Sequence, residues 1–232
     1  MIGLIGAMSV EIEALEGRLE EREETRIGMH RFVSGRLFGH EAVLAVCGPG
    51  KVNAALCAQA MILRFQPEWV LNLGVAGSGE SGVGIGDMVI ADAAVQHDMD
   101  TSPLGDPPGY VSMVGLTEFP CDADLAARLL RAAGKVEGMR VHRGIVATGD
   151  QFIHSAEQRT RIHDLFRAKA VEMEGAAVAH ACLMNGTPCA ILRSISDNAD
   201  GGSDMDYPAF VTLAAAHSQR VVGSLLTEEA AQ

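Results

Sequence analysis

Short apolar runs alternate along the chain with stretches whose apolar residues recur at helical spacing. The run IGLIGA at 2–7 predicts a buried strand, and EIEALEGRLEE at 11–21 predicts a helix after it. The runs at 31–37 and 40–48 are separated by a turn-like Phe-Gly pair, which predicts an antiparallel hairpin. Residues 51–65 again carry apolar positions at helical spacing and predict a second helix.

The same alternation continues to the end of the chain. Val- and Ile-rich runs at 69–77 and 86–98 predict strands, and 122–138 predicts an amphipathic helix that opens on an Asp cap. Between them, 99–120 is rich in Pro, Gly and Asp, and a loop of this length is usually functional or part of an interface. The remaining runs predict, in order, strand 140–150, helix 155–166, strand 168–174, helix 175–186, a strand from 188 into a glycine- and aspartate-rich loop, and helix 207–230.

These elements indicate one α/β domain over residues 1–232, with a mixed sheet flanked by helices. In such folds ligands bind at the carboxyl ends of strands. Candidate site residues do follow predicted strands: Glu11, Phe152, Glu172, Glu174 and the segment 193–197. We therefore expect these residues to meet at one edge of the sheet.

Composition restricts the class of partner. The net charge of −12 argues against nucleic acid, because neutralising phosphates requires clustered Lys and Arg. Five cysteines form no CxxC pair and sit mostly in apolar surroundings, which favours reduced thiols and a cytoplasmic location. No apolar run approaches the roughly 20 residues of a membrane span, so no membrane partner is expected.

The strand–glycine–helix text at the start of the chain could indicate a dinucleotide site. The G-x-G-x-x-G fingerprint is not met, and Glu11 and Glu13 stand where a pyrophosphate would approach. The other interpretation is that these acids only favour the positive end of a helix dipole. The glycine-rich stretch 72–87 would let backbone approach a ligand, but it is also typical of a simple turn.

The segment HDMD offers His97, Asp98 and Asp100 as possible metal ligands. No second cluster at a recognised spacing accompanies them, and the chain has neither HExxH nor a calcium-loop pattern. We expect solvated or loop-capping acids here and no metal.

The segments AVEMEG and LRSISDNAD carry the strongest chemistry. In an extended chain Glu172 and Glu174 would share a face, and Asp197 follows Arg193 at a strand end. An acid held near another acid in a partly buried site has a raised pKa and can donate a proton near neutral pH. For Arg193 and Glu172, a buried salt bridge that ties two strands together is an equally open alternative.

Six sequence motifs together are typical of one protein family. In order over nearly the whole chain, they are GAMSVEIEAL, GPGKVNAAL, NLGVAGS, GDQFI, VEMEGAAVAH and RSISDNAD. Together they resemble the 5′-methylthioadenosine/S-adenosylhomocysteine nucleosidases of the purine nucleoside phosphorylase superfamily. The resemblance implies a three-layer α/β sandwich around a mixed sheet and a homodimer. It also implies hydrolysis of the bond between adenine and ribose, without metal or cofactor, in methionine salvage.

The resemblance also implies residue roles. Asp197 would protonate adenine N7 with Ser196 beside it, Glu11 would deprotonate the attacking water, and Arg193 would help to fix that water. Glu174 would hold the ribose hydroxyls, with Glu172 near it or acting only as the partner of Arg193. The other expected substrate contacts are a stacking ring at Phe152, the backbone of Ile153, Ala76 and Gly77, and apolar surface from Met8, Met173, Tyr207 and Phe210. The loop 99–109 would reach the partner subunit's pocket.

Phosphorolysis is the main rival within the superfamily. It needs cations for phosphate, whereas this chain has Glu11 in the first loop and Asn72-Leu73 before Gly74, which favours water as the nucleophile. Two departures from the family pattern border the substrate, Val75 in place of a serine and Pro49 in place of an aliphatic residue. They leave open the preferred 5′ group: methylthioadenosine, adenosylhomocysteine, 5′-deoxyadenosine or aminofutalosine. A non-catalytic nucleoside-binding protein is the alternative from another class.

Overall fold

The computed structural model describes residues 1–199 and 207–230, without the side chains of 207–209 and 228–230. The helices are α1 (Ser9–Glu16), α2 (Lys51–Phe65), the short 3-10 helix η1 (Ser102–Leu104), α3 (Ala123–Ala133), α4 (Ala156–Phe166), α5 (Gly175–Asn185) and α6 (Tyr207–Ala230). The strands are β1 (Ile2–Gly6), β2 (Glu20–Ile27), β3 (His30–Leu37), β4 (His40–Val46), β5 (Trp69–Ser78), β6 (Met88–Gln96), β7 (Glu118–Pro120), β8 (Val141–Thr148), β9 (Ala168–Glu172) and β10 (Cys189–Asp197).

All strands belong to one mixed sheet. The parallel neighbours of β5 are β1 and β10, while β9 pairs antiparallel with its last residues. From β10 the sheet continues through β6 and β8 to β9, so five strands close into a ring. On the other side of β1 the sheet opens through β4 and β3 to β2. The ring brings the carboxyl ends of β5, β9 and β10 together.

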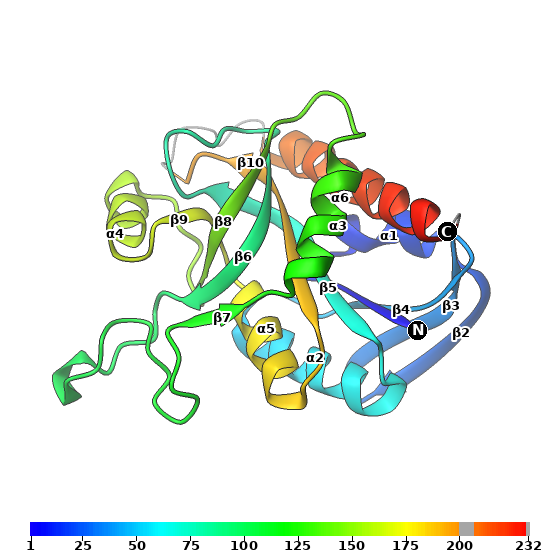
Figure 1. Ribbon diagram of the computed structural model, residues 1–232, viewed down its shortest axis with the longest axis horizontal. Coiled ribbons are helices and arrows are strands. Elements are labelled where there is room, and N and C mark those ends of the chain that lie inside the picture. Colours follow the sequence, from blue (N-terminus) through cyan, green and yellow to red (C-terminus); the bar gives the residue numbers. More distant parts are fainter. Residues whose placement is uncertain (200–206, 231–232) are drawn as a thin grey trace.

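Helices cover both faces of the sheet, as Figure 1 shows. On one face α2 and α5 pack together and bury small residues and cysteines against the strands. On the other face α1, α3 and α6 bury leucines and valines. The predicted three-layer α/β class is thus confirmed.

The prediction from the sequence was wrong in the segment that follows α1. The predicted helix 11–21 ends at Glu16, and an unpredicted strand, β2, begins at Glu20. Gly17 ends the helix, and β2 lies at the exposed edge of the sheet, where its charged side chains need no apolar alternation. Gly35 on β3 allows the close pairing, since a Cβ there would lie 2.4 Å from the Glu20 carbonyl oxygen.

The long loop 99–120 is largely confirmed. It contains η1 and ends in the three-residue β7, which pairs with β6. In Figure 1 its first part projects away from the sheet at the lower left.

In the part of the chain that the structure describes, no helix has both the length and the apolar character to cross a bilayer. The single domain over 1–232 and the cytoplasmic location stay predictions.

Candidate active site

Glu11 lies in the first turn of α1, directly after β1, and its side chain is buried. Its Oε2 accepts hydrogen bonds from the amides of Ala7 (2.7 Å) and Met8 (2.9 Å), and its Oε1 accepts from the amide of Val75 (2.9 Å). Burial raises the pKa of Glu11, while the hydrogen bonds from Met8 and Val75 oppose that rise. A Cβ at Gly74 would lie 2.6 Å from Oε1, so only glycine lets β5 approach this carboxylate. The sequence and fold therefore fix a buried acid with an elevated pKa at this end of the sheet.

Asp197 ends β10 and is held by its immediate neighbours. Its Oδ2 accepts from the Ser196 hydroxyl at 2.9 Å, and its Oδ1 accepts from the Ala199 amide at 2.8 Å. A Cβ at Gly77 would lie 2.9 Å from Oδ1, which again requires glycine on β5. Both oxygens of the Asp197 carboxylate are thereby hydrogen-bonded to protein, which fixes its orientation.

Glu172 ends β9 and forms a buried ion pair with Arg193. Its Oε2 also accepts from the amides of Glu174 (3.0 Å) and Gly175 (2.7 Å), at the start of α5, and its Oε1 accepts from the Thr148 hydroxyl. The alternative of a salt bridge that ties two strands together describes this pair.

Arg193 has no donor left for a ligand. It is 1 % exposed, and its five N–H groups meet Glu172, the Asn72 carbonyl and side-chain oxygens, and the Leu192 carbonyl. Because β5, β9 and β10 supply acceptors for all of these N–H groups, Arg193 keeps no free N–H group for the expected contact with a water.

Glu174 points differently from Glu172, contrary to the expectation of a shared strand face. The strand ends at Glu172, and Glu174 precedes α5 with φ −132° and ψ −37°. Its Oε1 accepts from the Gly50 amide at 2.8 Å. Burial, and next the charge of Glu172, raise the pKa of Glu174 to about 7.

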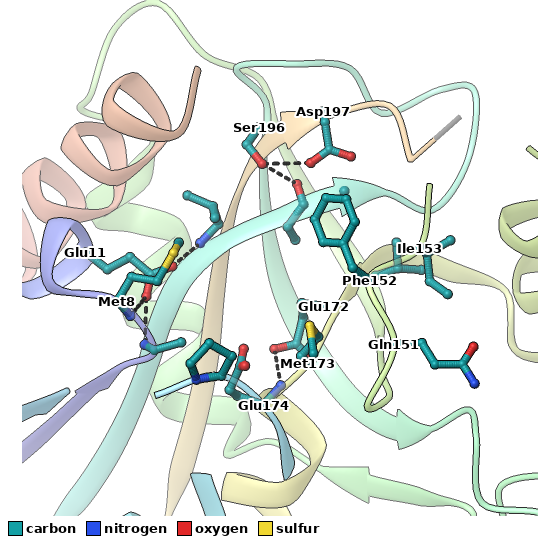
Figure 2. A pocket seen from close by; sticks show the side chains of 16 residues that line it. Met8, Glu11, Gln151, Phe152, Ile153, Glu172, Met173, Glu174, Ser196 and Asp197 are labelled. Carbon is teal, nitrogen blue, oxygen red and sulfur yellow. Dashed lines mark hydrogen bonds between the residues drawn. The ribbon is translucent and has the colours of Figure 1, made fainter. Parts of the chain in front are cut away.

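These side chains surround one pocket, shown in Figure 2. The carboxylates of Glu11, Glu174 and Asp197 lie on different sides of it. The predicted residues that line the pocket are Met8, Glu11, Ala76, Gly77, Phe152, Ile153, Glu172, Met173, Glu174, Ser196 and Asp197. Phe152 is 58 % exposed at the pocket, whereas Ile153 is buried. One edge of the sheet thus gathers candidate residues from β1, β5, β9 and β10, as expected.

Two predicted residues with described side chains do not line this pocket, and the side chain of a third lies outside the described residues. Arg193 lies beneath Glu172, and Phe210 on α6 is half-buried elsewhere. Tyr207 begins α6, but its side chain lies outside the described residues.

Lining residues absent from the predicted set are Ala7, Pro49, Val75, Gln151 and Val171. The sequence did mark Pro49 and Val75 as departures bordering the substrate. Ala7 and Gln151 adjoin predicted residues, and Val171 is an apolar strand residue with no signal of its own.

The pocket is acidic and carries no cationic lining. None of the described residues that line it is Lys, Arg or His. An anionic co-substrate would meet four acidic side chains there, of which Glu172 is paired with Arg193, whereas a neutral nucleoside and water would not be repelled.

Comparison with known proteins identifies the family. The family model of the phosphorylase superfamily matches residues 1–227. A 5′-methylthioadenosine/S-adenosylhomocysteine nucleosidase of Geobacillus thermodenitrificans is 40% identical over 226 residues, which cover 97% of this chain and 95% of that protein. The chain belongs to the 5′-methylthioadenosine/S-adenosylhomocysteine nucleosidase family.

Solved structures of the family agree with this assignment. The nucleosidase of Neisseria meningitidis in complex with methylthio-immucillin-A superposes with a TM-score of 0.93 at 37% identity, over 98% of both chains. A structure described as the futalosine hydrolase of Helicobacter pylori strain 26695 superposes with a TM-score of 0.92 at 37% identity, over 98% of this chain and 97% of that one.

Within this nucleosidase family, the two departures keep the acid framework intact. Val75 lacks the serine hydroxyl, but its backbone amide still donates to Glu11. Pro49 lines the pocket, and its carbonyl accepts from the Asn53 side chain at 2.7 Å. Both changes therefore alter the pocket surface and leave the acids in place.

The buried ion pair between Arg193 and Glu172 should make the protein sensitive to loss of either partner. Arg193→Met leaves Glu172 as an unpaired buried charge, so we expect the free energy of unfolding to fall by about 3–5 kcal/mol. Arg31→Met is the matched control, because Arg31 pairs with Glu16 at the surface, and we expect it to cost about 1 kcal/mol or less. Urea denaturation at neutral pH measures both. Equal losses in the two variants would contradict the role given to the buried pair.

Proposed function

We propose that this protein hydrolyses the N-glycosidic bond of 5′-methylthioadenosine, S-adenosylhomocysteine and 5′-deoxyadenosine, and releases adenine and the 5′-substituted ribose. The observation that carries the proposal is a pocket with three separately held carboxylates and no lining cation among the described residues. Family membership supports the same activity.

Cleavage of this bond builds positive charge on the ribose and negative charge on the departing adenine. In the proposed mechanism Asp197 delivers a proton to adenine N7, and the hydrogen bonds from Ser196 and Ala199 hold its carboxyl in place. The exposed ring of Phe152 stacks on the purine, and the backbone of Ile153 contacts its edge. Protonated adenine then leaves as a neutral base, which lowers the barrier to cleavage.

Glu11 activates the water in this scheme. Three backbone amides orient its carboxylate, and burial raises its pKa, which makes it a stronger base than a solvated glutamate. The water attacks the anomeric carbon as Glu11 takes its proton. Because Glu11 is itself an anion, it disfavours phosphate as the nucleophile.

Glu174 binds the ribose hydroxyls, and its carboxylate stabilises the cationic sugar. Met8 and Met173 supply the apolar surface for the 5′-thio group, together with Ala76 and Gly77. We assign Arg193 a positioning role in place of a water contact. It holds Glu172, whose carboxylate accepts hydrogen bonds from the backbone amides at the start of α5.

Aminofutalosine is a second candidate substrate. The observation in its favour is the Helicobacter pylori neighbour described as a futalosine hydrolase, which superposes as well as the nucleosidases do. Its bond to adenine is the same, so only the 5′ group distinguishes the two activities.

Purified enzyme mixed with methylthioadenosine in phosphate-free buffer is expected to release free adenine, followed by chromatography. Adenosylhomocysteine, 5′-deoxyadenosine and aminofutalosine in parallel reactions rank the 5′ groups. Adenine that appears only after phosphate is added would overturn the hydrolase proposal.

Two isosteric variants test the assigned acid and base. Asp197→Asn cannot protonate N7, and Glu11→Gln cannot take a proton from water, so we expect kcat to fall on the order of 10²–10⁴-fold in each. Adenine binding, measured by calorimetry, controls for an intact pocket. A loss below tenfold in either variant would remove that residue from its role.

The homodimer is part of the same proposal. Val52 and Leu56 on α2 and Met184 on α5 expose apolar side chains on adjoining helices, with Leu56 57 % exposed. Leu104, in the 99–109 loop, is 84 % exposed and is available to enter a partner's pocket. An apolar face of this kind is typical of a subunit interface.

We expect wild-type protein to have the mass of a dimer in light scattering, and Leu56→Glu to have the mass of a monomer because a charge enters the interface. Leu213→Glu is the control, since Leu213 is exposed on α6, on the opposite face of the sheet. A Leu56→Glu dimer would place the interface elsewhere.

A further inference from the structure

Asp98, from the HDMD segment, lies just past the end of β6. Its side chain binds both the start of α2 and the segment after β8. Its Oδ1 accepts from the Lys51 ammonium at 2.7 Å, and its Oδ2 accepts from the Asp150 amide at 2.9 Å. Lys51 and Asp98 are each 18 % exposed, and the ammonium also reaches Gln96 Oε1 at 3.3 Å. Both oxygens of Asp98 therefore have partners, one a cation and the other a backbone amide.

Asp150 extends this connection to the start of α2. Its Oδ1 accepts from the Lys51 amide at 2.7 Å, so the two aspartates hold Lys51 by its backbone and by its side chain. Asp150 also precedes Gln151, Phe152 and Ile153, which line the pocket. The position of Asp98 therefore affects both the first turn of α2 and the loop that faces the purine.

The first turn of α2 reaches Glu174. Gly50 precedes Lys51 with φ +96°, a conformation that favours glycine, and its amide donates to Glu174 Oε1. The charges that face Glu174 are Glu172 on β9, Arg193 on β10 and Glu11 on α1. The charges of Glu172 and Glu11 disfavour the ionised form of Glu174. The hydrogen bond from the Gly50 amide favours it.

We propose that Asp98 is a positioning residue, which holds Lys51 and Asp150 so that the Gly50 amide stays on Glu174. The assignment of Glu174 to the ribose rests on the proposed function. The simpler alternative is a tie between α2 and the sheet that contributes only to stability. The two differ in one observable: only a positioning role changes the ionisation of Glu174.

Asp98→Asn is the test variant, because an amide accepts from one donor and turns its own N–H groups toward the other. Loss of the Asp98 contacts with Lys51 and Asp150 weakens the hydrogen bond from the Gly50 amide to Glu174. The Glu174 carboxyl should therefore titrate at higher pH than in the wild type. A ¹³C carboxyl titration by NMR measures this directly, without substrate. Asp92→Asn is the control, since Asp92 lies on β6, the strand that leads to Asp98, and pairs with Arg143 at the surface.

Kinetics give the second readout. Ionised Glu174 is lost as pH falls through its pKa, so a higher pKa moves the acid limb of kcat/KM to higher pH. We expect kcat/KM to fall about tenfold at neutral pH in Asp98→Asn, comparable to one hydrogen bond to a charged group. Lys51→Met should move both readouts in the same direction, whereas Lys51→Arg, which keeps a cation on Asp98, should restore them.

The outcomes separate the two proposals. An unchanged Glu174 titration in both Asp98→Asn and Lys51→Met would overturn the positioning role, and so would an equal change in Asp92→Asn. Wild-type protein that releases no adenine while the Glu174 titration still shifts in Asp98→Asn would overturn the proposed function and leave the positioning role standing. If Asp98→Asn fails to fold, Lys51→Met against Lys51→Arg decides.

Discussion

The buried ion pair between Arg193 and Glu172 is the interaction on which the rest of the site depends. A guanidinium with all five donors satisfied joins β10, β5 and β9 at the point where their carboxyl ends converge. Such a pair is costly to desolvate, and it persists only because each oxygen and each N–H has a partner. Glu172 in turn binds the amides at the start of α5, and so the pair fixes where Glu174 begins its helix.

Around this pair the acids have different environments, which is why similar carboxyl groups can have different tasks. Glu11 is held by backbone amides alone, and burial raises its pKa. Glu174 lies next to the charge of Glu172, and its pKa rises to about 7. Asp197 is oriented by a serine hydroxyl and an amide. Glycines on β5 let two of these carboxylates come close to the strand, which gives a steric reason for glycine at two positions of the stretch 72–87.

Much of this arrangement could be predicted from the sequence, because periodicity and chain order define it. The helix at 51–65 and the hairpin at 31–48 follow from local pattern, and the convergence of Glu11, Glu172 and Asp197 follows from their places after strands. β2 could not be predicted, because an exposed edge strand of charged residues carries no alternation. The different directions of Glu172 and Glu174 could not be predicted either, since they depend on where β9 stops. Nor could the sequence predict that every N–H of Arg193 has an acceptor, because two of these bonds go to Asn72, 121 residues away in sequence.

In the proposed mechanism an acidic pocket, with no cation among its described lining residues, directs water and not phosphate to the sugar. The most direct test follows methylthioadenosine turnover by ³¹P NMR at a high concentration of inorganic phosphate. We expect adenine and free 5-methylthioribose in equal amounts, with no new phosphate ester resonance. A sugar 1-phosphate resonance that grows in step with adenine would contradict it.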